Sequence, residues 1–230
     1  MNNTIAVFKN QINEFLADKE QLLMYAIFPL LALVQTRVMD LDYGVYPYQI
    51  ISVFGAMFAA SVMIMLLPAV IAEHRENCSL RFMVMSGIKP GSYLLGIGGF
   101  FLLMNMLVAL FFAWLGEFTG SALGRFLLTM FLAFVCSTLV AAIIGILSKN
   151  RQKAMGLSLP IGMGVAFLPM FAGSIEPLHA IVDILYIGRI NNMMVNVTNQ
   201  VYYTDLFVVL ANIIALLVIF VILFKKKGMN

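Results

Sequence analysis

Charged residues are scarce in this chain. Only 11% of its 230 residues are Asp, Glu, Lys or Arg, whereas 62% are hydrophobic, and the mean hydropathy is +0.98. A soluble globular domain carries roughly a quarter charged residues, so this composition excludes that class and predicts an integral membrane protein. The net charge of +3 is small and gives no indication of a nucleic-acid partner.

Residues that build catalytic and metal sites are also rare, with two cysteines and two histidines. Cys78 lies between apolar runs and Cys136 lies within one, so the two are not expected to form a disulfide or a metal site. The chain has no H-E-x-x-H motif, no arrangement of a serine with a base, and no P-loop motif G-x-x-x-x-G-K-[ST]. An intramembrane enzyme is therefore the weakest hypothesis, and no catalytic or metal-ligating residue is assigned.

Six apolar segments each have nearly the ~20 residues that a helix needs to cross a bilayer. Because backbone groups in lipid must be satisfied internally, they predict an all-α membrane domain, residues 1–230, with six transmembrane helices. The first and fifth segments are the least regular, since Gln35 and Arg37 lie in the first and Pro160 and Pro169 interrupt the fifth. The segments span approximately residues 22–39, 50–72, 93–115, 126–147, 155–172 and 206–224.

Basic residues are distributed unequally between the two sides of these spans. Eleven Lys and Arg residues fall on one side, and three, Arg37, Arg125 and Arg189, fall on the other. The positive-inside rule then predicts a plasma-membrane protein with both termini in the cytoplasm, loop 73–92 inside and segment 173–205 outside. The span interiors hold almost no ionisable groups, which makes an ion channel or secondary carrier the weaker alternative to a driven transporter.

Two segments outside the spans have the pattern of amphipathic helices. In 4–20, apolar residues recur at steps of three and four, which predicts an interfacial helix on the membrane lipid. In the loop 73–92, residues 79–85 place Leu80 and Met83 on one side of a helix and Arg81 on another, and Gly87 and Pro90 end it. That helix is about 10 to 15 Å long, so it can lie on a surface but cannot span.

Particular stretches of sequence carry a family resemblance. Residues 73–81 read E-H-R-E-N-C-S-L-R, residues 86–90 read S-G-I-K-P, and residues 93–96 read Y-L-L-G. Residues 167–173 read F-L-P-M-F-A-G, with Pro177 and a polar stretch before the last span. In this order the elements resemble the type-2 ATP-binding-cassette exporter permeases. One departure is that this family usually has Gly-Thr where the chain has Cys78-Ser79.

The resemblance implies a bacterial permease that moves an apolar or amphiphilic cargo, such as a peptide, antibiotic or lipid, out of the cell. A separate ABC ATPase subunit would bind ATP and Mg, because this chain has no nucleotide motif and no cofactor of its own. A second permease would complete the transporter, and short outer helices would precede the last span. The residues expected to couple to the ATPase are Glu73, Arg75, Glu76, Ser79, Leu80, Arg81, Phe82 and Met83, with the apolar members as anchors and the charged ones as the rim.

Two further sets of residues within the spans have alternative interpretations. Gly156, Pro160 and Gly164 recur every four residues and form a flat ridge for close helix packing. The resemblance implies a dimer interface on the first and fifth spans, and packing within one subunit is the alternative. Asn105 and Ser158 are polar residues in spans, where interhelical hydrogen bonds are favoured and contact with the cargo path is the alternative.

Overall fold

The computed structural model describes residues 19–43, 47–76, 90–172, 176–198 and 203–227, and within them the secondary structure is helical. Six long helices correspond to the six apolar segments, and two short ones precede the last of them. Their bounds are α2 Lys19–Tyr43, α3 Pro47–Glu76, α5 Pro90–Leu115, α6 Gly120–Leu147, α7 Arg151–Ala172, α8 Glu176–Ile184, α9 Tyr186–Val195 and α10 Tyr203–Lys227. The predicted helices 4–20 and 79–85 lie outside the described residues, apart from the start of α2.

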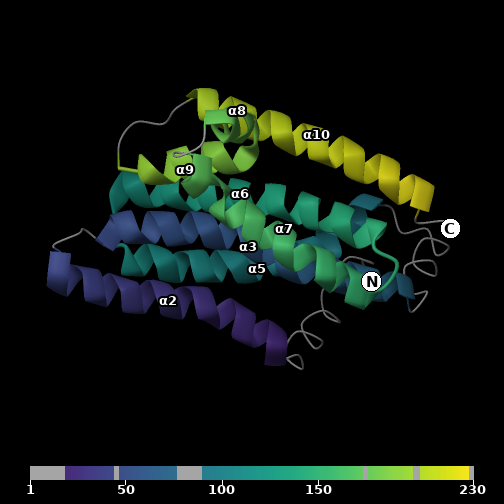
Figure 1. Cartoon of the computed structure of the whole chain (residues 1–230), viewed down its shortest axis with the longest axis horizontal. Coiled ribbons are helices and arrows are strands. Elements are labelled where there is room, and N and C mark those ends of the chain that lie inside the picture. The colour runs from purple at the N-terminus through teal and green to yellow at the C-terminus, as the bar shows by residue number, and fades with distance from the viewer. Residues whose placement is uncertain (1–18, 44–46, 77–89, 173–175, 199–202, 228–230) are drawn as a thin grey trace.

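Helix α3 is the centre of the bundle, and α2 and α10 lie at its two outer sides (Figure 1). α3 packs against α2, α5, α6, α7 and α9. In its most apolar stretch 78% of the residues are buried, compared with 11% in α10. An apolar helix that is buried all round belongs to the core, whereas one with a largely exposed apolar surface is suited to face lipid. Any displacement of α3 therefore acts on most of the other helices.

The predicted spans are confirmed in five cases. α3, α5, α6, α7 and α10 each contain a stretch long and apolar enough to cross a membrane. α2 is a helix of 25 residues, but its apolar stretch covers only Tyr25–Val38, so a sixth crossing stays a prediction. Its flanks are more polar because Lys19 and Glu20 precede this stretch, and Gln35 and Arg37 lie near its end. The fifth span contains Pro160 and Pro169, and α7 continues as one helix through both.

Helices α8 and α9 confirm the expected pair of short helices, and the structure shows how they pack. α9 contacts α3, α6, α7 and α10, and α8 contacts α7. The Tyr186 hydroxyl lies 3.2 Å from Ser137 Oγ of α6, and Ser137 donates a hydrogen bond of 2.8 Å to the carbonyl of Ala59 in α3. The hairpin is thus inserted between the long helices, and its polar groups are satisfied there, as burial requires.

Charged residues join this hairpin to α10. Arg189 of α9 forms an ion pair of 3.1 Å with Asp205 Oδ1 in the first turn of α10. Its Nε donates a hydrogen bond of 2.8 Å to the carbonyl of Asp183 at the end of α8. Asp205 is almost completely buried. A buried carboxylate needs such a partner to compensate for its lost hydration. Through its ion pair and its hydrogen bond, Arg189 therefore links α8, α9 and α10.

Candidate functional site

The end of α3, which directly precedes residues 77–89 in the sequence, lies beside the start of α7. Near the end of α3, Glu73 Oε2 forms an ion pair of 2.8 Å with the Arg151 guanidinium of α7. One turn later, Glu76 Oε2 accepts a hydrogen bond of 3.2 Å from the Arg151 backbone N–H. We call Glu73, Glu76 and Arg151 the α3–α7 junction. It connects the helix that enters the loop with a helix far away in the sequence.

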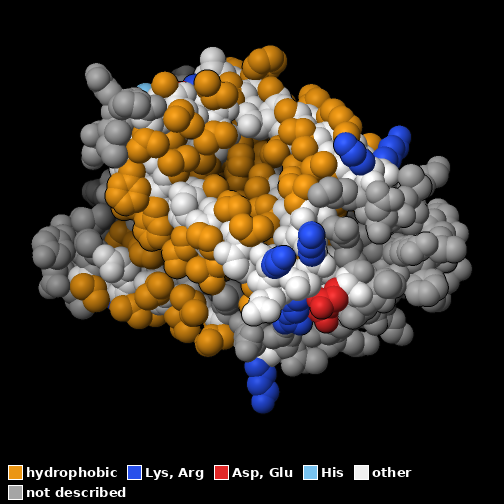
Figure 2. All heavy atoms as spheres, turned by 45° about the vertical axis from the view of Figure 1, so that its right-hand side comes forward, with side chains coloured by type: hydrophobic (Ala, Val, Ile, Leu, Met, Phe, Trp, Pro, Cys, Tyr) orange, Lys and Arg blue, Asp and Glu red, His pale blue; other side chains and the backbone are white. Residues whose placement is uncertain are grey.

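The start of α7 explains why two carboxylates gather at this junction. Asn150 Oδ1 accepts a hydrogen bond of 3.0 Å from the Lys153 N–H, so Asn150 caps the helix at its N-terminus. The first N–H groups of a helix lack intrahelical partners and carry a partial positive charge, which favours a nearby carboxylate. Glu76 uses this property, and Glu73 adds an ion pair with Arg151. The Lys, Arg and acidic side chains gather at one end of a largely hydrophobic face in Figure 2.

The predicted coupling residues fall into two groups. Glu73 and Glu76 are described, and both contact Arg151, a partner that the sequence reasoning missed. Asn150 followed by Arg151 at the start of an apolar segment is a capping signal that indicates where α7 begins. The remaining coupling residues, whose side chains lie outside the described part of the chain, are Arg75, Ser79, Leu80, Arg81, Phe82 and Met83.

The expected ridge of α7 points away from its own subunit. Gly156, Pro160 and Gly164 are all exposed, and a Cβ atom added at Gly156 or Gly164 would meet nothing within 4 Å. A second ridge, offset by two residues, packs against α3. It is formed by the small buried residues Ala154, Ser158, Gly162 and Ala166. A Cβ atom at Gly162 would come within 2.9 Å of Met65 Cγ, so close helix packing within the subunit uses this second ridge.

An apolar groove of about 520 Å³ lies between α2, α3 and α7. Its walls include Phe28 of α2, Met57 and Met65 of α3, and Met163 and Phe167 of α7. Methionine and phenylalanine present a flexible, polarizable surface that fits varied apolar shapes. The groove suits an acyl chain or an apolar side chain and offers almost nothing to an ion.

Asn105 and Ser158, the residues considered for the cargo path, are both buried. The Asn105 side-chain amide of α5 donates hydrogen bonds to the Tyr25 hydroxyl of α2 at 2.8 Å and to the Phe101 carbonyl at 2.6 Å. Ser158 of α7 donates to the Met65 carbonyl of α3 at 3.3 Å. In this arrangement the two residues join helices of one subunit, and neither is among the residues that line the apolar groove.

The comparisons with known proteins agree with this architecture. No curated protein matches the chain. A sequence model for ABC-2 family transporter proteins matches residues 1–225, which include every helix described above except the last residues of α10. The chain therefore belongs to the ABC-2 family of transporter proteins, as a membrane permease component.

Proposed function

We propose that this permease exports an apolar or amphiphilic cargo and is driven by a separate ATPase that docks on loop 73–92. The observation that carries the proposal is the α3–α7 junction. The loop continues directly from α3, and Glu73 and Glu76 connect that end of α3 to the first residue of α7. A force applied to the loop would therefore act on two helices that form walls of the apolar groove.

The groove supports the choice of cargo. The groove opens to the outside of the helix bundle, toward the lipid. Several apolar residues that line it are also exposed, namely Ile27, Leu31, Met163, Phe167 and Met170. A cargo dissolved in the lipid could enter it sideways without crossing a polar surface. Export is consistent with an ATPase on the side that the positive-inside rule places in the cytoplasm. Peptides, antibiotics and lipids with an apolar portion all fit this description.

We further propose that a second permease packs on the exposed sides of α2 and α7. Only 22% of the most apolar stretch of α7 is buried within the subunit. The ridge of Gly156, Pro160 and Gly164 offers a flat surface on which a second helix can approach closely, which is how helices associate in lipid. The apolar groove lies between the two helices, so pairing on this face would place the grooves of both subunits near the dimer interface.

Replacing Gly164 with leucine is expected to weaken the pairing of permeases at least ten-fold, which corresponds to about 1.4 kcal/mol. The added side chain would hold the partner helix away from the ridge. Single-molecule photobleaching of labelled chains in liposomes measures the dimer fraction. Gly162→Leu is the matched control, because that residue faces Met65 of its own subunit and should lower the thermal midpoint of the subunit instead. An unchanged dimer fraction for Gly164→Leu would assign the ridge to lipid.

Reversing the charge of Arg151 to glutamate is expected to reduce cargo moved per ATP hydrolysed by up to about five-fold. The ion pair with Glu73 is partly exposed and is worth at most about 1 kcal/mol, so the fold should persist. The double variant Glu73→Arg with Arg151→Glu should recover most of the lost coupling. The assay is ATP-dependent uptake of a fluorescent amphiphilic peptide and of a fluorescent lipid into inside-out vesicles. Equal coupling in all variants would remove the junction from the mechanism.

A further inference from the structure

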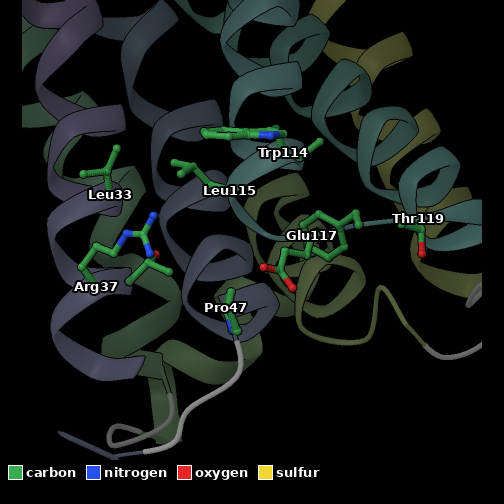
Figure 3. Close-up of a pocket in the computed structure, with 10 residues that line it drawn as sticks. Leu33, Arg37, Pro47, Trp114, Leu115, Glu117 and Thr119 are labelled. Carbon is green, nitrogen blue, oxygen red and sulfur yellow. The ribbon is translucent and has the colours of Figure 1, made fainter. Parts of the chain in front are cut away.

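A second pocket lies at the end of the bundle opposite the α3–α7 junction. It has a volume of about 390 Å³, within the range of sites that bind small molecules. Its walls come from the last turns of α2, the start of α3 and the turn between α5 and α6 (Figure 3). Unlike the apolar groove, it combines charged and apolar side chains, among them Leu33, Arg37, Pro47, Trp114, Leu115 and Glu117.

The turn between α5 and α6 holds Glu117 in an unusual backbone conformation. Its φ is 54°, in the left-handed region where glycine or asparagine normally follows a helix. The turn is well supported, because the Phe118 ring stacks on Phe126 at 4.5 Å between centroids and Phe118 N–H donates to the Ala113 carbonyl at 3.2 Å. Glu117 thus presents a carboxylate from a strained backbone position. Such strain is often found at functional sites.

Arg37 and Glu117 face the same space from opposite walls. In Figure 3 the Arg37 guanidinium and the Glu117 carboxylate both point toward the gap between α2 and the turn. Both side chains are exposed, and among the described residues neither forms an ion pair or a hydrogen bond to another side chain. Within the described part of the chain, a positive and a negative group are therefore both available to one ligand.

The apolar part of the pocket lies deeper along the helices than the charged part. Leu33 is one turn before Arg37 in α2, and Trp114 precedes Glu117 at the end of α5, with its ring above the charged groups in Figure 3. Trp114 is 70% exposed, and tryptophan is favoured at the boundary between lipid and water. The arrangement of groups in the pocket thus matches that of an amphiphilic molecule, with charged groups at the outer end and apolar surface toward the membrane.

We propose that this outer pocket binds the headgroup of a zwitterionic amphiphile. The Arg37 guanidinium would take its phosphate or carboxylate through two parallel hydrogen bonds, and the Glu117 carboxylate would accept hydrogen bonds from its primary ammonium. Trp114, Leu33 and Leu115 would cover the first carbons of its chain. The site does not depend on the direction of transport or on the identity of the cargo, so it can be tested without an ATPase.

Trp114 is the only tryptophan of the chain, so its fluorescence reports directly on the pocket. Dihexanoyl phosphatidylethanolamine, titrated into the purified full chain in maltoside detergent, is expected to shift the emission saturably. The phosphatidylglycerol and phosphatidylcholine of equal chain length should each bind about ten-fold more weakly, since neither presents a primary ammonium to Glu117. Free phosphoethanolamine, which has no acyl chain, should bind more weakly still if the apolar wall contributes.

Variants of the two charged residues separate their roles. Arg37→Gln should weaken phosphatidylethanolamine and phosphatidylglycerol alike, by about ten-fold, whereas Glu117→Gln should weaken phosphatidylethanolamine only. Glu117→Gly is the control for folding, because glycine adopts the left-handed conformation freely; its thermal midpoint should not fall while its selectivity for the ammonium is lost. Equal affinities of the wild type and all three variants for phosphatidylethanolamine, or a shift that dihexanoyl glycerol reproduces, would overturn the proposal.

Discussion

Truncating both Leu80 and Met83 to alanine is expected to reduce ATP-driven transport at least ten-fold while the chain still inserts into the membrane. Burying an apolar side chain of this size in a groove of a partner is worth about 1.5 to 3 kcal/mol, so losing two would weaken ATPase docking by an order of magnitude or more. Both residues lie outside the predicted spans, which is why insertion should not change. Co-purification of the ATPase with the tagged permease measures docking, and peptide uptake into inside-out vesicles measures transport.

The matched control is truncation of two exposed apolar residues in the last span, Leu210 and Ile214 of α10. That double variant should leave docking and transport unchanged. If Leu80→Ala with Met83→Ala binds the ATPase normally and transports normally, the coupling role of loop 73–92 is wrong. If it binds normally but fails to transport, the loop transmits movement without providing the docking energy.

Replacing Gly188 with alanine is expected to cost about 1 to 3 kcal/mol of stability, the usual range for overpacking a close contact. A Cβ atom there would clash with the carbonyl oxygen of Val182 and would lie 2.9 Å from its carbonyl carbon. These are backbone atoms, so α8 and α9 would have to separate. Because the hairpin packs against α3, α6, α7 and α10, the separation should lower the thermal midpoint of the whole chain and expose the hairpin to protease.

Gly124→Ala provides the comparison for this variant. Gly124 lies in α6, and a Cβ atom there would meet nothing within 4 Å. Alanine is favoured over glycine in a helix interior by about 1 kcal/mol, so this variant should unfold at the same temperature or a higher one. A thermal midpoint for Gly188→Ala that equals that of Gly124→Ala would show that the two short helices can part without loss.

Hydrophobic patterning predicted the class of this protein and most of its helices because both depend on local composition. A run of about twenty apolar residues can satisfy its backbone in lipid only as a helix, whatever surrounds it. The spans in α3, α5, α6, α7 and α10 follow from this rule, whereas Gln35 and Arg37 limit the apolar stretch of α2. The family was also accessible from sequence, since the loop at 73–81 and the stretch at 167–173 keep their residue types in order.

The sites depended on relations between distant residues, and there the sequence left alternatives open. Both ridges of α7 have small residues at steps of four, and only packing shows that Gly162 faces Met65 whereas Gly164 faces outward. Likewise, no local pattern connects Glu73 with Arg151 or Arg37 with Glu117.

By itself, then, the sequence determined that the chain is an apolar helical permease without a P-loop, because span length, charge distribution and motifs are local properties. The tertiary structure alone decided which face of each helix is covered. The reason is that a side chain is covered only where a neighbouring helix packs against its side of the helix. Helix packing joins α3 to α7 at Arg151 and places α8 and α9 against the long helices. It also brings Arg37 and Glu117, which form no ion pair among the described residues, to one pocket.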